Sequence, residues 1–171
     1  MDLTPAELTI LGLIVEQPRH GYELEQVIAQ RGVRQWTDIG FSSIYYVLTR
    51  LERRGLIDAD EGRGKSRRVF RPTEEGNRVA ADATREFIAE LQSVRHPILI
   101  GLANMSLIGD ASFDEALRHR LGQVEKRIAS IRSAELKQSP LPHPAREVFS
   151  FSLCLWEAER AWLAARVEVS R

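Results

Sequence analysis

The chain has 171 residues, enough for one compact domain or for a small domain with a dimerisation element. Hydrophobic residues make up 43% of it, and 24 basic and 24 acidic side chains cancel to a net charge of +0, which excludes a polycation that coats nucleic acid without selectivity. The single cysteine, Cys154, excludes an internal disulfide, and no secretory signal pattern opens the chain, so we expect a cytoplasmic protein.

The first predicted elements are two short helices. Residues 4–7 (Thr-Pro-Ala-Glu) form a helix start, with the threonine as N-cap, the proline at the first helical position and the glutamate completing a capping box. The residues that follow, up to Val15, are apolar on most sides of a helix, which predicts a core helix. Pro18 and Gly21 end it and open a second helix, which is expected to stop near Gly32.

A third helix is predicted over residues 42–54, ended by Gly55. One face has the apolar spacing of a helix packed on a core, with Ile44, Val47, Leu48 and Leu51. The opposite face is centred on Ser42, Tyr46, Thr49 and Arg53, with Tyr45 and Arg50 on its flanks and Ser43 at its edge. These side chains can hydrogen-bond bases or phosphates, so the face is a candidate DNA-reading surface; the alternative is a solvated polar face.

A β-hairpin with a basic turn is predicted next. Residues 56–61 and 69–71 have strand character, and the glycine-rich turn over residues 62–68 contains Arg63, Lys65, Arg67 and Arg68. From residue 40 to residue 72 the chain has eight basic and four acidic side chains, so this segment is positive in a neutral chain. A charge run can be a solvated loop, but beside a helix of this kind it favours a wing on the phosphates or in the minor groove.

Thr73 is expected to cap a fourth helix with an apolar stripe of Val79, Ala83, Phe87, Leu91 and Val94. Three helices, a strand, a basic turn and a strand, in this order, are typical of a winged helix-turn-helix. We therefore predict a mainly α fold, with an N-terminal winged helix-turn-helix that has a two-stranded wing over residues 1–95 and a C-terminal all-helical dimerisation domain over residues 96–171.

Two long helices are predicted in the second half. A capping box at residues 112–115 opens the first, whose coiled-coil-like seam is Phe113, Leu117, Leu121, Val124, Ile128 and Ile131. After a proline-rich loop at residues 140–144, the second has a face formed by Val148, Ser152, Leu155, Glu159, Trp162 and Arg166, with Phe149, Trp156 and Leu163 beside it. An apolar run at residues 98–108 is too short to span a bilayer.

Such amphipathic helices bury their faces in their own core or on a twin chain, and both can hold here. We expect a homodimer whose interface includes Leu117, Leu121, Val124, Ile128, Leu155, Trp156, Trp162 and Leu163. Trp156 and Trp162 are also candidates to stack on an aromatic effector, although tryptophans at helical spacing are more often interface core. The apolar neighbours of Cys154 favour a buried thiol over a redox sensor.

Several segments resemble the PadR family of transcriptional regulators. They are residues 10–14 (Ile-Leu-Gly-Leu-Ile), 18–23 (Pro-Arg-His-Gly-Tyr-Glu), 43–45 (Ser-Ile-Tyr), 48–52 (Leu-Thr-Arg-Leu-Glu), 55–57 (Gly-Leu-Ile) and 73–76 (Thr-Glu-Glu-Gly). Residues 156–162 (Trp-Glu-Ala-Glu-Arg-Ala-Trp) resemble the branch with the longer C-terminal domain. The chain departs from the family pattern at Tyr46, where proline is usual, and at Ser42, where glycine is frequent; we expect a changed operator sequence with DNA binding intact.

The resemblance implies a homodimer that reads a pseudo-palindromic DNA operator, with half-sites about ten base pairs apart or a multiple of that. It further implies a repressor relieved by a small aromatic or drug-like effector. Since no catalytic motif stands out in the sequence, we expect neither enzyme activity nor a cofactor. Gly21 is expected to allow a tight turn into the second helix. Tyr22 is a weaker DNA-binding candidate, since a core aromatic with its hydroxyl at the surface explains it equally well.

Two other classes of function compete with this prediction. Residues 64–66 (Gly-Lys-Ser) imitate the end of a phosphate-binding loop, but that motif needs glycine at position 59, where the chain has Ala59, and a helix directly afterwards. The four histidines are far apart and lack metal-ligand spacing. The stronger competitor is a winged helix used for protein–protein contacts, which would need no basic wing and would bind with little salt dependence.

Overall fold

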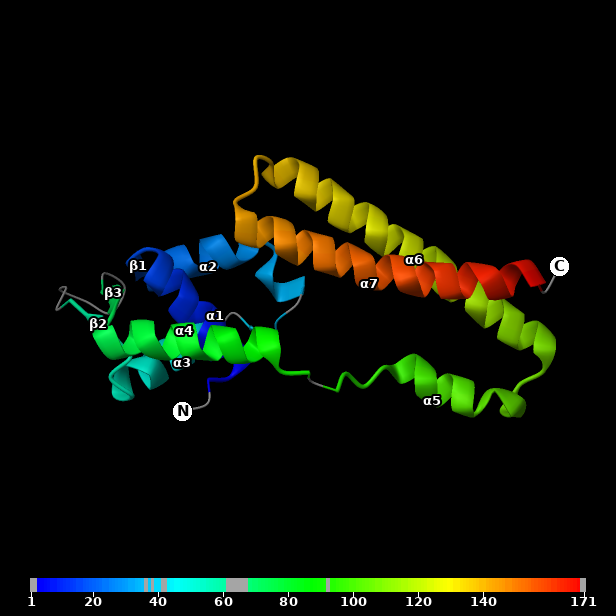
Figure 1. Ribbon diagram of the computed structural model, residues 1–171, viewed down its shortest axis with the longest axis horizontal. Coiled ribbons are helices and arrows are strands. Elements are labelled where there is room, and N and C mark those ends of the chain that lie inside the picture. Colours follow the sequence, from blue (N-terminus) through cyan, green and yellow to red (C-terminus); the bar gives the residue numbers. More distant parts are fainter. Residues whose placement is uncertain are drawn as a thin grey trace. The chain divides into compact units, whose positions relative to one another are not determined.

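The computed structural model describes residues 3–35, 37, 39–40, 43–60, 68–91 and 93–169. Over these residues the chain is mainly helical with one small antiparallel sheet, as predicted (Figure 1). It divides into two compact units, Met1–Ser93 and Val94–Arg171.

The first unit combines helices with a three-stranded sheet. The helices are α1 (Pro5–Glu16), α2 (Gly21–Gln30), α3 (Ser43–Arg53) and α4 (Glu74–Ala89), with a 3-10 turn at Val33–Gln35. The strands are β1 (Arg19–His20), β2 (Ile57–Ala59) and β3 (Val69–Pro72), in the order β1-β3-β2. Strand β1 adds a third strand to the predicted hairpin; its two residues are too few to carry an alternating pattern, and they pair with Phe70 and Val69.

Local signals in the sequence set the helix ends. At the start of α1 the Thr4 hydroxyl accepts a hydrogen bond from the Glu7 N–H at 3.2 Å, and the Glu7 carboxylate accepts one from the Thr4 N–H at 2.8 Å. This is the predicted capping box. After α3, Gly55 adopts a φ of 67°, a left-handed conformation that favours glycine and ends the helix.

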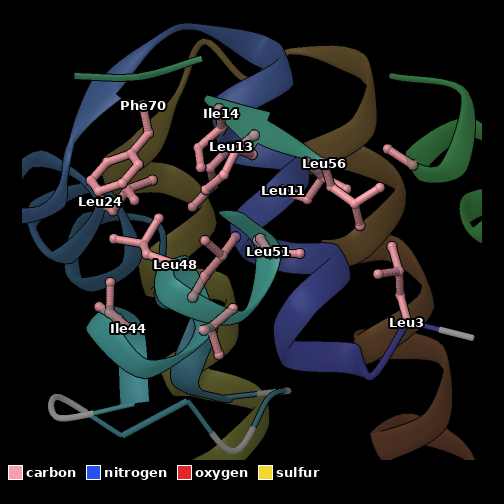
Figure 2. Close-up of a cluster of buried hydrophobic side chains, with 14 of the residues drawn as sticks. Leu3, Leu11, Leu13, Ile14, Leu24, Ile44, Leu48, Leu51, Leu56 and Phe70 are labelled. Atoms are coloured by element: carbon pink, nitrogen blue, oxygen red, sulfur yellow. The ribbon is translucent and has the colours of Figure 1, made fainter. Parts of the chain in front are cut away.

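The core of the first unit lies where α1, α2 and α3 meet the sheet (Figure 2). The predicted apolar stripe of α3 is buried there, with each of its four residues 5% exposed or less; they are Ile44, Val47, Leu48 and Leu51. They lie among Leu11 and Ile14 of α1 and Phe70 of β3, which are also buried. Because one side of α3 is fixed in this core, its opposite side is held toward solvent.

Helix α4 begins at a tight contact with the hairpin. The Thr73 hydroxyl accepts a hydrogen bond from the Gly76 N–H at 2.9 Å and donates one to the Gly55 carbonyl at 2.8 Å. A Cβ on Gly76 would lie 1.9 Å from the Leu56 carbonyl oxygen, so only glycine fits at this point. The predicted cap at Thr73 is therefore confirmed, and it also joins α4 to the end of α3.

The predicted stripe of α4 is correct only in its first half. Val79 and Ala83 are buried, but the helix ends at Ala89, so Leu91 and Val94 lie beyond it and are 100% and 70% exposed. The spacing of apolar residues cannot show where the packing partner of a helix ends, and here that partner is the short helix α1.

The second unit is helical throughout its regular elements. It contains α5 (Pro97–Ala103), a 3-10 turn at Met105–Leu107, and the long helices α6 (Asp110–Gln138) and α7 (His143–Val169), which pack as an antiparallel hairpin (Figure 1). The predicted capping box at residues 112–115 is wrong, since Ser112 lies inside α6 and the N-cap is Gly109. The helix starts at Asp110, whose charge suits the positive end of the helix dipole.

The α6–α7 hairpin has its own apolar core. The residues at its centre are 6% exposed or less; they are Leu117, Val124, Ile128 and Leu163. Since α6 and α7 of one chain already bury most of the surface of these four residues, their part in a dimer interface stays a prediction. The other predicted interface residues keep accessible surface: Leu121, Trp156 and Trp162 are half-buried, and Leu155 is 57% exposed.

Candidate nucleic-acid interface

The outward side of α3 brings together most of the predicted reading face. Tyr45, Tyr46, Thr49 and Arg53 are exposed, Tyr46 to 66%, and Ser43 is half-buried in the first turn. Ser42 lies outside the described residues. The Thr49 hydroxyl donates a hydrogen bond to the Tyr45 carbonyl at 2.9 Å. In the part of the chain that the structure describes, Arg53 has no ion-pair partner, so its guanidinium group is available to a ligand.

Tyr45 of α3 and Tyr22 at the start of α2 are the tyrosines that flank this surface. Tyr45 packs on Gly21, where a Cβ would lie 2.8 Å from the tyrosine Cε1 atom. Gly21 therefore provides room for a ring; it has no positive φ, so the expected tight turn is not its reason. Tyr22 is 51% exposed and stacks on His20 with ring centroids 5.4 Å apart, which makes it a surface aromatic and not a core one.

Arg50 is held by an acidic side chain from another helix. Its Nε lies 2.9 Å from a carboxylate oxygen of Glu7, and Arg54 Nη1 lies 3.1 Å from the same oxygen. Burial, to 1% exposure, would raise the pKa of the Glu7 carboxyl, but hydrogen bonds with Thr4 and the two arginine charges together lower it. The sequence could not reveal this pair, because Glu7 was accounted for by the capping box. Arg50 is therefore less available to DNA than Arg53.

The basic turn is only partly described. Arg63, Lys65 and Arg67 lie outside the described residues. Arg68, the first residue after them, is two-thirds buried and is bound by its guanidinium group to the carboxylate of Glu52 on α3. Arg68 is therefore paired and partly buried, whereas the sequence predicted an unpaired cation on the wing that is free to bind DNA.

An apolar groove in the second unit contains both candidate effector residues. The groove has a volume of about 540 Å³ and lies between α5 and α7, with Trp156, Trp162 and Glu159 in its lining. Arg166 stacks on the Trp162 ring at 3.6 Å, and Arg120 pairs with Glu159 at 2.6 Å. An apolar lining with two indoles suits a flat hydrophobic group.

Several other features of the described residues bear on function. Cys154 is exposed, so the expectation of a buried thiol is wrong: its position on α7 turns away from the α6 side that buries Leu163. The residues described contain no cluster of side chains suited to a metal ion. None of the helices among them has the length and apolar character needed to cross a membrane.

A buried α3 stripe, a polar outward face and an adjoining β-hairpin define a winged-helix protein. Residues 10–82 match the Transcriptional regulator PadR-like family. A Lysinibacillus sphaericus protein described as "Uncharacterized protein X" is 32% identical over 96 residues, which cover 54% of this chain and 86% of that protein. The chain belongs to the PadR-like family, whose members are transcriptional regulators and not enzymes.

Solved structures share this fold over nearly the whole chain. Bacillus subtilis PadR in complex with operator DNA is 16% identical, with a TM-score of 0.79 and coverage of 97% of this chain and 99% of that one. Bacillus subtilis PadR in complex with p-coumaric acid is 17% identical, with a TM-score of 0.80 and coverage of 95% and 96%. The likeness includes the C-terminal helices, which agrees with the predicted fold class.

Proposed function

We propose that this regulator binds a double-stranded DNA operator with α3 in the major groove. The observation that carries the proposal is the orientation of α3, whose buried stripe turns Tyr46, Thr49 and Arg53 toward solvent on a helix fixed in the core. Glu52, the only carboxylate in the sequence of α3, is paired with Arg68, so its charge opposes phosphates less than a free carboxylate would.

The flanks of α3 supply contacts that do not depend on base sequence. Tyr22 and Tyr45 border it with exposed phenol groups, which suit phosphate oxygens. Arg63, Lys65 and Arg67 of the turn are proposed to meet phosphates or the minor groove, on the strength of their charge and their place in the sequence. Binding should therefore be strongly salt-dependent.

A homodimer is the second part of the proposal. The second unit leaves apolar side chains exposed on α5, the turn after it and α7; they include Leu99, Ile100, Leu107, Phe151 and Leu155. Exposed apolar side chains in this number favour an interface. A second copy of the chain would cover it and set two α3 helices against half-sites about ten base pairs apart, or a multiple of that.

The third part concerns control of binding. We propose that the protein is a cytoplasmic repressor released by a small aromatic effector, with the groove beside Trp156 and Trp162 as its site. The volume of about 540 Å³ lies within the range of small-ligand sites. A protein of the same fold, Bacillus subtilis PadR, has been solved in complex with p-coumaric acid, which supports an aromatic ligand.

A gel-shift titration on DNA upstream of the protein's own gene, at several salt concentrations, tests the DNA-binding proposal. We expect a footprint and an affinity that falls steeply with salt. Lys65→Ala should weaken binding to all sequences and reduce the salt slope by about one. An affinity indifferent to salt, with no footprint, would instead favour the protein–protein interaction module.

A further inference from the structure

We propose that Arg68 is a positioning residue that holds the β2–β3 hairpin against α3, and not a phosphate contact. The inference deepens the proposed DNA-binding function and rests on it. Its basis is a group of four residues, the Arg68 cluster, which consists of Arg68, Glu52, Phe70 and His20.

Side chains of two elements fix the guanidinium group of Arg68. Both terminal nitrogens of its guanidinium group donate to the two carboxylate oxygens of Glu52 on α3, with Nη1 3.4 Å from Oε2 and Nη2 bonded to Oε1. The guanidinium carbon lies 5.5 Å from the ring centroid of Phe70, which is itself buried in the core. A two-pronged pair above an aromatic ring uses the planar shape of arginine, which lysine cannot reproduce.

The backbone of Arg68 is tied to the start of α2. Its carbonyl oxygen lies 3.2 Å from Nδ1 of His20, and since a carbonyl only accepts, this ring nitrogen carries the proton. The backbone N–H of His20 in turn donates to the Glu23 carboxylate at 2.7 Å. The side chain and the backbone of one residue thus join β3 to both helices of the helix-turn-helix.

Strand β3, which begins directly after Arg68, offers a matched comparison. Arg71 pairs with Asp60 at 3.2 Å, but both side chains are more than half exposed, and the pair links only the two edges of the hairpin. Arg68 and Glu52 are each about one-third exposed and link the hairpin to α3. Solvent screens an exposed pair such as Arg71–Asp60 to little or no net effect, so it serves as a control with the same charges.

The two roles for Arg68 make opposite predictions about Glu52. If Arg68 binds phosphate, Glu52 is an acidic side chain that competes for it beside DNA, and Glu52→Gln should strengthen binding. If Arg68 positions the hairpin, Glu52→Gln frees it and should weaken binding to the operator, although a negative charge has been removed. Removing the negative charge of Glu52 would by itself reduce its repulsion of DNA and strengthen binding, so it cannot explain weaker operator binding.

The experiment measures operator affinity of the full chain against KCl concentration for the wild type, E52Q, R68Q and R68K, with D60N and R71K as controls. We expect roughly tenfold weaker operator binding for E52Q, R68Q and R68K, the size of one charge-assisted hydrogen bond, with an unchanged salt slope. The two controls should bind within about twofold of the wild type, as expected for an exposed pair. Thermal unfolding of each variant verifies that the first unit remains folded.

A different pattern would overturn the inference. Equal or tighter binding by E52Q shows that Glu52 only repels DNA. A salt slope reduced by about one in R68Q and restored in R68K identifies Arg68 as a phosphate ligand. In both cases the wild type still binds its operator, so the proposed function survives. If the wild-type chain shows no salt-dependent binding to any DNA duplex, the proposed function itself is wrong, and this is known before any variant is compared.

Discussion

Arginine side chains near α3 fall into two groups according to their partners. Arg50 and Arg54 share the Glu7 carboxylate, and Arg68 is bound to Glu52. Arg53 is exposed and has no such partner among the described residues. The charge of a paired arginine is partly compensated by its carboxylate, whereas no described residue compensates the charge of Arg53. Of these four residues, Arg53 is therefore the best placed to read a base.

A helical projection of the sequence cannot make this distinction. The projection places Arg50 on the flank of the reading face, and the glycine-rich composition of residues 62–68 places Arg68 in the basic turn. Neither pattern tells whether these side chains are paired. What decides their availability is a carboxylate brought close by folding, from α1 for Arg50 and from α3 for Arg68. Such pairs join residues far apart in sequence, and no local pattern indicates them.

Tyr46→Ala tests which residues read sequence. Tyr46 is 66% exposed on the α3 face and departs from the usual family pattern, so its loss should change the preferred bases and weaken the original operator by about 1–3 kcal/mol. Selection of sites from random DNA provides the measurement. Tyr22→Ala is the matched control, since a phosphate contact should weaken all sequences alike. An unchanged consensus for Tyr46→Ala would contradict the assignment.

Glu7→Gln tests the buried charge behind α3. The variant keeps the shape of the capping group but leaves Arg50 and Arg54 without their anion, so we expect a loss of about 1–3 kcal/mol in unfolding free energy at neutral pH, measured in urea. The control is Glu16→Gln, whose exposed pair with Arg31 is screened by water and should cost less.

The Glu7 effect should also depend on pH in a defined direction. Its folded pKa is lowered, so the stabilisation is complete above the ordinary value of 4.5 and is lost as the pH falls through the folded pKa. The gap between wild type and Glu7→Gln should therefore close on acidification below 4.5. A gap that stays constant down to the acid transition would show that the charge of Glu7 contributes nothing.

At the scale of elements, the sequence predicts well what local chemistry decides. Thr4 and Thr73 cap helices and Gly55 ends one, because each acts on backbone groups within a few residues. Strand β1 exists only through its pairing with β3, and α4 buries apolar residues only as far as Ala83 because it packs against the short helix α1. These features depend on distant residues, so a single sequence does not contain them.

Gly76→Ala tests the join between α4 and the hairpin. The added methyl group would collide with the Leu56 carbonyl, which cannot move without shifting the hairpin, so we expect a loss of about 1–3 kcal/mol in unfolding free energy. Gly12→Ala in α1 is the matched control: no atom lies within 4 Å of the added carbon, and alanine should stabilise the helix by about 0.5–1 kcal/mol. Similar effects of both substitutions would show that helix propensity alone is at work.

At the scale of the whole molecule, the two units differ in how completely they bury their apolar residues. The first unit encloses its core within one chain, from Leu3 to Ala83. The second buries the centre of the α6–α7 hairpin but leaves α5 without a single buried residue, although Leu99 and Ile100 lie on it. A helix of this composition is stable only when something covers it. This is the physical reason to place the contacts of the proposed dimer on α5 and the adjoining face of α7.

Replacing Ile100 and Leu107 by glutamate in one variant tests that placement. Both side chains are at least 70% exposed, so the fold of one chain should tolerate the change, while a charge in an apolar dimer interface is costly. We expect a monomer by sedimentation, with affinity for the palindromic operator reduced about a hundredfold because two linked reading heads become independent. Ser130→Glu, an exposed polar position on α6, controls for added charge and should remain dimeric. The affinity of the variant for an isolated half-site should equal that of the wild type. If the variant stays dimeric and keeps full operator affinity, the dimer interface lies on another face of the second unit.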